Sequence, residues 1–199
     1  MERVLTSLNH QEPDRVPFFL LATLHGAREL GLGIKEYFSQ AKYVVDGQLR
    51  MRKRYRHDCL SGFFFASLEI EAWGGEVVYA EDGPPNSGQP PLNVLEDITR
   101  LEPPRIEDAC GLQRILESLR LLKQQSGDEV PLIGVALSPF SLPVLQLGFE
   151  LYFDLLNERP DLFRRLMSIN QEFCVQWANA QLDAGASVIC YFEDRKSVV

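Results

Sequence analysis

Residues 131–137 read Pro-Leu-Ile-Gly-Val-Ala-Leu, an apolar run without polar alternation. Such a run predicts a strand that is buried on both faces, as in a parallel sheet, because strands with one solvated face alternate apolar and polar residues. Three further runs of this type occur at residues 16–21, 58–65 and 187–192. The sequence therefore predicts a sheet of four buried strands.

Helical patterns separate these runs. Residues 112–125 form an amphipathic pattern whose apolar face consists of Leu112, Ile115, Leu116, Leu119 and Leu122. Further helices are predicted at 37–55, 149–157 and 160–185. Strands that alternate with helices favour right-handed βαβ units. An open doubly wound sheet and part of a (β/α)8 barrel both fit, but no glycine-rich nucleotide-binding motif follows any run, which weakens the open-sheet alternative.

The length favours a partial barrel. A complete (β/α)8 barrel needs about 200 to over 400 residues, whereas four units occupy all 199 residues here. A short strand at 76–80 and a turn-rich loop at 83–91 account for part of the extra length, and we interpret the loop as an active-site loop. We expect residues 1–199 to form the N-terminal portion of one barrel domain whose C-terminal portion is absent.

Composition narrows the function classes. The net charge of −8 argues against nucleic-acid binding by phosphate neutralisation. No apolar run approaches the roughly 18–20 residues of a membrane span, and no secretory signal opens the chain, so we expect a cytoplasmic protein. The four cysteines and three histidines show no metal-ligand spacing, so no metal site is predicted in this chain.

Several short motifs, taken in order, resemble the uroporphyrinogen decarboxylase superfamily. They are residues 9–17 (NHQEPDRVP), 71–74 (EAWG), 130–134 (VPLIG), 139–142 (PFSL) and 183–186 (DAGA). The resemblance covers nearly the whole chain and implies a (β/α)8 TIM barrel with about its first half present here. The superfamily has two main chemistries, which are cofactor-free decarboxylation of uroporphyrinogen and zinc-dependent methyl transfer from a corrinoid to a thiol.

The methyltransferase-like branch matches better. The decarboxylases carry an Arg-rich stretch after the first strand, but here that region offers only Arg28. Phe65 and Leu145 stand where the decarboxylases carry an aspartate and a tyrosine, and a phenyl ring cannot accept hydrogen bonds from pyrrole groups. Residues 71–74 and 192–197 resemble the corresponding methyltransferase elements, with Glu193 in place of an aspartate and an aspartate in place of a proline.

The resemblance and the expected barrel face point to a set of site residues, because active sites of such barrels form where the strands end. The expected catalytic residues are Glu71, Glu193 and Asp194, and the expected substrate-binding residues are His25, Glu69 and Phe140. The alternatives left open are that Glu69 and Glu71 are solvated acids at a helix start, and that His25 is a structural histidine.

Cofactors and partners follow from the resemblance alone. This chain is expected to bind no cofactor itself, with zinc held in the absent C-terminal portion and a methylcorrinoid as substrate or partner cofactor. The expected partner is a corrinoid protein or a small-molecule methyl acceptor, with no nucleic acid or membrane, and a homodimer is a further option. The alternative functions are uroporphyrinogen decarboxylation in porphyrin metabolism, and a truncated, inactive barrel that acts as an interaction module.

Overall fold

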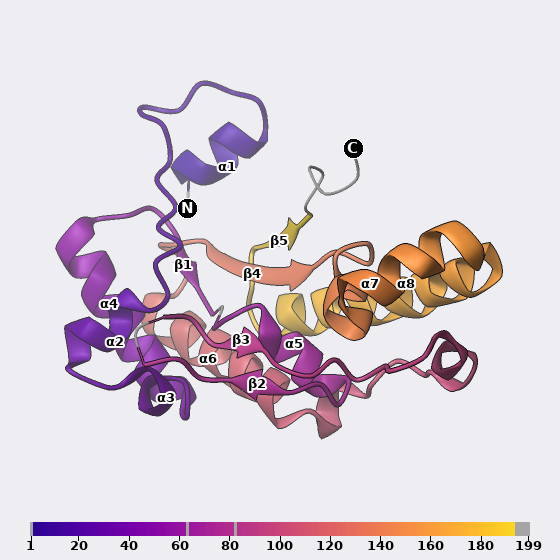
Figure 1. Ribbon diagram of the computed structural model, residues 1–199. Coiled ribbons are helices and arrows are strands. Elements are labelled where there is room, and N and C mark those ends of the chain that lie inside the picture. Colours follow the sequence, from indigo (N-terminus) through magenta and orange to yellow (C-terminus); the bar gives the residue numbers. More distant parts are fainter. Residues whose placement is uncertain (1, 63, 82, 194–199) are drawn as a thin grey trace.

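A parallel sheet of three strands organises the fold of the computed structural model (Figure 1). The structure describes residues 2–62, 64–81 and 83–193. The strands are β1 (Leu60–Ser61), β4 (Leu132–Leu137) and β5 (Val188–Phe192), and they lie in the order β1-β4-β5. They arise from the second, third and fourth apolar runs, so the predicted parallel sheet is confirmed for these three runs.

The chain between the strands is mostly helical. The helices are α1 (Glu2–Leu8), α2 (His25–Leu30), α3 (Ile34–Tyr37), α4 (Ala41–Tyr55), α5 (Ser67–Ala72), α6 (Cys110–Ser126), α7 (Leu142–Glu158) and α8 (Pro160–Asp183), with two 3₁₀ helices, η1 (Leu95–Arg100) and η2 (Ile106–Asp108). One crossover, which contains α6, leads from β1 to β4, and a second, which contains α7 and α8, leads from β4 to β5. This is the βαβ order that the sequence predicts.

The central strand β4 is buried on both faces, because all six of its residues are buried. Leu132 and Ala136 pack in the main hydrophobic core with the helices, whereas Ile133 and Val135 pack with residues of the N-terminal segment. Figure 1 shows the same layers, with α6 and α8 on one side of the sheet and α1 on the other. A strand covered on both faces has no need of polar alternation, which explains its continuous apolar sequence.

Helix α8 approaches β4 closely. Gln181 donates to the Val135 carbonyl at 3.1 Å and accepts from the Val135 N–H at 3.0 Å. A Cβ atom at Gly134 would lie 2.9 Å from the Gln181 side-chain oxygen and 2.6 Å from the Cδ1 atom of Ile189. Only glycine fits at this point without a shift of its neighbours.

The prediction of a strand at residues 16–21 is wrong. This segment is extended but belongs to no strand, and Val16, Phe18 and Leu21 are exposed. Phe18 makes one pair of contacts beside β1, since its carbonyl accepts from the Asp58 N–H and its N–H donates to the Asp58 carboxylate. The preceding residue, Pro17, has no N–H to donate, which helps to explain why no ladder forms there.

Other boundaries also differ from the predictions. The short strand expected at 76–80 is β2 (Val77–Val78), and it pairs in antiparallel fashion with β3 (Asn86–Ser87) from the turn-rich loop, outside the parallel sheet. Helix α7 begins at Leu142, seven residues before the expected start at 149. Gly148 interrupts the helix with φ 75° and ψ 169°. The helical sequence pattern begins only after Gly148, so the sequence does not predict the helical segment before the interruption.

Candidate active site

The strands β4 and β5 end side by side, where Leu137 pairs with Phe192. The turn at residues 138–141 follows β4 and leads into α7. The Ser138 N–H donates to the Phe192 carbonyl at 3.0 Å, and the Ser138 hydroxyl accepts from the Ser141 N–H at 3.0 Å. The start of α7 is thereby fixed at the carboxyl edge of the sheet, which is where parallel barrels build their active sites.

A cavity of about 830 Å³ opens at this edge. Its lining is mostly apolar and aromatic and comes mainly from α7 and from the ends of β4 and β5. The lining residues are Ala66, Leu137, Phe140, Ser141, Val144, Leu145, Phe149, Tyr152, Phe153, Leu156, Asn157, Tyr191, Phe192 and Glu193. Within the part of the chain that the structure describes, the lining contains one carboxylate and no arginine, lysine or histidine.

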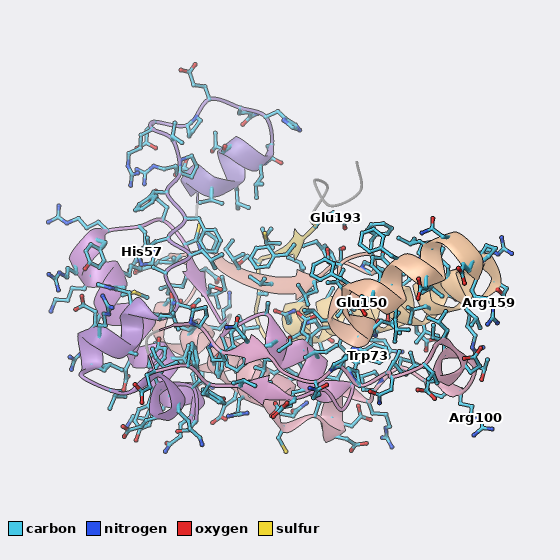
Figure 2. The ribbon with its side chains drawn as sticks, viewed as in Figure 1. His57, Trp73, Arg100, Glu150, Arg159 and Glu193 are labelled. Carbon is cyan, nitrogen blue, oxygen red and sulfur yellow. The ribbon has the colours of Figure 1, made fainter. Side chains whose placement is uncertain are left out.

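Two of the predicted site residues, Phe140 and Glu193, line this cavity together. The rings of Phe140 and Tyr152 lie edge to face with centroids 6.0 Å apart, and the Tyr152 hydroxyl donates to the Phe140 carbonyl at 3.4 Å. Figure 2 shows Glu193 at the end of β5, beside α7. Burial raises the pKa of Tyr152 to about 12, and the nearby charge of Glu193 adds to the rise. The predicted catalytic residue Asp194 lies outside the described residues.

Glu69 does not line the cavity, but it forms a hydrogen bond with the backbone of Leu137, which does. Its buried carboxyl group accepts from the Leu137 N–H at 3.1 Å and from the Trp177 indole N–H at 3.3 Å. The Cys174 thiol donates to the Leu137 carbonyl from the same side, at 3.2 Å. Burial raises the pKa of Glu69 to about 8, although both hydrogen bonds oppose the rise. The structure therefore shows Glu69 holding the last residue of β4, and the alternative of a solvated helix-start acid is wrong for it.

The structure does not bring Glu71 together with Glu193. Glu71 is exposed, and its carboxylate lies 3.9 Å from the guanidinium group of Arg114 on α6. It lines a second cavity of about 330 Å³, formed with residues 104, 105 and 108–112 near the start of α6. The two glutamates predicted to face one pocket thus lie in two separate cavities, and the solvated alternative describes Glu71 better.

His25 lies near the opposite edge of the sheet. Its Nε2 atom is 2.7 Å from the Tyr55 hydroxyl and 3.2 Å from the Glu29 carboxylate. Tyr55 ends α4, five residues before β1 begins, so this cluster belongs to the amino edge of the sheet. The expected position of His25 in the cleft is therefore not observed, and a structural role linking α2 to α4 fits its contacts.

Sequence reasoning missed most of the cavity wall. Phe149, Tyr152 and Phe153 project from α7 into the lining, and Tyr191 joins them from β5. Phe149 and Phe153 are 62% and 52% exposed, so they stand away from the core. Large aromatic residues four apart on the outer side of a helix were the signal that could have identified them.

The described residues offer no metal centre. Within residues 2–62, 64–81 and 83–193, no three His, Cys, Asp or Glu side chains lie close enough together to hold a metal ion. The zinc that the methyltransferase resemblance implies does not fit the residues present here.

In the same part of the chain, no helix combines the length and apolar character needed to cross a membrane.

Comparison with known protein families shows the family to which the chain belongs. The family model for uroporphyrinogen decarboxylase (URO-D) matches residues 1–199. The chain belongs to the URO-D family. Membership of the URO-D family, together with the parallel sheet, implies a TIM-barrel fold.

Curated URO-D relatives are longer than this chain. The uroporphyrinogen decarboxylase of Bordetella petrii is 29% identical over 76% of this chain and 43% of its own length. That of Ralstonia pickettii is 27% identical over 95% of this chain and 55% of its own length. The chain thus spans about half the length of the curated relatives it matches.

A solved structure shares the fold of this URO-D family chain. It is a methyltransferase from Methanosarcina mazei, with a TM-score of 0.76 and 20% sequence identity. The match covers 94% of this chain and 56% of the methyltransferase chain. At this level of identity, the likeness establishes the common fold.

Proposed function

We propose that this chain supplies the N-terminal half of a (β/α)8-barrel methyltransferase of the URO-D family. The intact protein would move a methyl group from a methylated corrinoid to a thiol or a related acceptor. A corrinoid protein or a small-molecule acceptor would then be its partner. The methyltransferase named among the structures of the same fold is consistent with this proposal.

The character of the cavity carries the proposal. Uroporphyrinogen is a polyanion, and a protein that binds its carboxylates needs arginine or lysine side chains. The described lining offers none, and its one charged group, Glu193, is itself an anion. Arg28 belongs to α2 and does not contribute to the lining. An apolar cavity of this kind suits a neutral or cationic methylated ligand better than a polyanion.

In the proposed mechanism, the residues of this chain would shape the cavity and hold its backbone in place. The apolar wall would exclude water, and Glu69 would fix the backbone of Leu137 where that residue enters the lining. Because the described residues form no metal site, no step is assigned to zinc, which would have to be held by residues outside this part of the protein.

A direct assay tests the proposal. The intact protein, of which this chain would supply the N-terminal half, is incubated with methylcobalamin and a thiol. Loss of the methylcobalamin absorbance is followed together with thioether formation. We expect methyl transfer to the thiol and no change in added uroporphyrinogen. Formation of coproporphyrinogen without methyl transfer would overturn the proposal.

Decarboxylation remains the second candidate, because the curated relatives at 27–29% identity carry that name. It requires a different binding mode for the substrate carboxylates, supplied from outside the described lining. The same incubation with uroporphyrinogen decides between the two activities.

The third candidate is an interaction module without activity, for which an unpaired edge of the described sheet would be the binding surface. Strand β5 pairs only with β4 within the described sheet, so it is an edge strand. Exposed edges invite pairing with another chain. An absence of both activities together with stable association would support this candidate.

A further inference from the structure

Aromatic side chains form a large part of the wall of the cavity at the carboxyl edge. Six of them line it, from α7, from β5 and from the turn after β4, namely Phe140, Phe149, Tyr152, Phe153, Tyr191 and Phe192. The face of an aromatic ring carries partial negative charge and attracts organic cations. Clusters of such rings recognise quaternary ammonium groups.

A single carboxylate completes this wall. Glu193 lies at the rim, and its charge is felt at the buried hydroxyl of Tyr152. Within residues 2–62, 64–81 and 83–193, Glu193 makes no ion pair, and its side chain is exposed. A carboxylate next to aromatic rings supplies the counter-charge that an ammonium ligand needs.

We propose that this cavity binds a methylated ammonium group, with the aromatic side chains around the methyl groups and Glu193 as the counter-ion. The inference concerns the same cavity that carries the proposed function, and it adds a ligand class that is neither the methylcorrinoid donor nor the thiol acceptor of that reaction. The volume of about 830 Å³ accommodates a ligand larger than the ammonium group alone.

The charge of the cavity lining and the net charge of the chain also favour a cationic ligand over an anionic one. The described lining presents no cation to an anionic ligand, and the chain as a whole carries a net charge of −8. An anion entering the cavity would meet Glu193 without a compensating partner, whereas a cation is attracted. The cavity therefore discriminates by charge as well as by shape.

Equilibrium binding to the purified chain tests the inference without any turnover. The probes are choline, its neutral carbon isostere 3,3-dimethylbutan-1-ol, and the anion 3,3-dimethylbutanoate. Choline carries a trimethylammonium group, and the other two carry a tert-butyl group of the same shape. Saturation-transfer NMR detects weak binding, and calorimetry gives the affinities. We expect choline to bind at least about tenfold more tightly than the neutral isostere, and the anion not to bind.

Two variants locate the site. Glu193→Gln should weaken choline binding about tenfold and leave the neutral isostere unchanged, whereas Glu150→Gln should change neither, because Glu150 is on α7 but outside the lining. Phe149→Leu keeps an apolar side chain and removes a ring, so it should weaken choline selectively. Phe149 is 62% exposed, and a thermal unfolding curve verifies that the variant is folded.

Clear results would overturn the inference. They are equal affinity for choline and the neutral isostere, binding of the anion, or an unchanged choline affinity in Glu193→Gln. Failure of methyl transfer from methylcobalamin with selective choline binding intact would refute the proposed function alone. Methyl transfer without selective choline binding would refute the ligand class alone.

Discussion

Glu69 and Glu71 stand two residues apart on α5 and have opposite environments. Successive residues of an α-helix are about 100° apart around the axis, so side chains at i and i+2 do not share a face. Glu69 consequently points into the core, where Leu137 and Trp177 donate to it, and Glu71 points towards Arg114 at the surface. One residue holds the end of β4, and the other is solvated.

The raised pKa of Glu69 predicts a pH-dependent stability. The group titrates near its ordinary value of 4.5 in the unfolded chain and at about 8 in the folded one. Its contribution to stability is thus fully present below 4.5 and is lost as pH rises towards 8, at a cost of roughly 3–5 kcal/mol. Glu69→Gln cannot ionise and should lose this part of the slope, as measured by urea unfolding between pH 5 and 8.5.

The matched control for this experiment is Glu71→Gln on the same helix, which should keep the slope of the unchanged chain. Trp177 is buried beside Glu69, so its fluorescence reports unfolding at this site. Parallel pH profiles for the two variants would contradict the assignment.

Asp58 explains part of the motif that opens the chain. Its carboxylate accepts from the Phe18 N–H at 2.8 Å and from the guanidinium groups of Arg3 and Arg15. Burial works against ionisation of Asp58, but these partners outweigh it and lower its pKa. Asp14 binds Arg3 in turn, so the aspartate and arginine of the DRVP motif tie the N-terminal segment to the start of β1.

Asp58→Asn should lower the free energy of unfolding by about 1–2 kcal/mol, because one acceptor remains while the ion pairs are lost. The loss should shrink as pH falls below the ordinary value of 3.8, since protonation removes the same interactions from the unchanged chain. Denaturant unfolding at pH 7 and pH 3 measures both effects. Asp14→Asn, at an exposed position, should cost less, and an equal cost would argue against the central role of Asp58.

At the level of elements, the interruption in α7 shapes the cavity. Gly148 has φ 75° and ψ 169°, a backbone conformation open essentially to glycine alone. The residues before it follow the turn after β4, and those after it carry Phe149 and Phe153 into the lining. The interruption therefore sets the position of half the aromatic wall relative to the strand ends.

Gly148→Ala should destabilise the chain by about 1–3 kcal/mol and weaken ligand binding in the cavity, because a side chain strains this backbone conformation. Gly33→Ala is the control, since Gly33 has φ −67° and open space around its Cα. Urea unfolding and choline titration measure the two effects. Unchanged stability in Gly148→Ala would show that α7 can straighten without cost.

At the scale of the whole molecule, the described sheet has open edges. Strand β5 pairs on one side only, and Val188, Cys190 and Phe192 are only partly covered on the face opposite the helices. Closed barrels have no such edge. At β5, the described sheet thus exposes unpaired backbone hydrogen-bonding groups next to a partly exposed apolar face.

We expect the isolated chain to self-associate through this edge and face. Sedimentation velocity over a hundredfold range of concentration should show a rising average mass. High salt should not reverse it, since strand pairing and apolar burial are not screened as surface charges are. A compact monomer with cooperative unfolding at every concentration would show instead that the chain is stable without a partner.

The sequence by itself determined the three parallel strands, the long helices α6 and α8 and the family resemblance, because these depend on local periodicity and on ordered motifs. The tertiary structure decided that the run at 16–21 is not a strand, since its exposure and Pro17 depend on what packs beside it. It also decided the site. Whether a carboxylate lines a cavity depends on helix phase and on contacts between segments far apart in the chain, and these separated Glu193 from Glu69, Glu71 and His25.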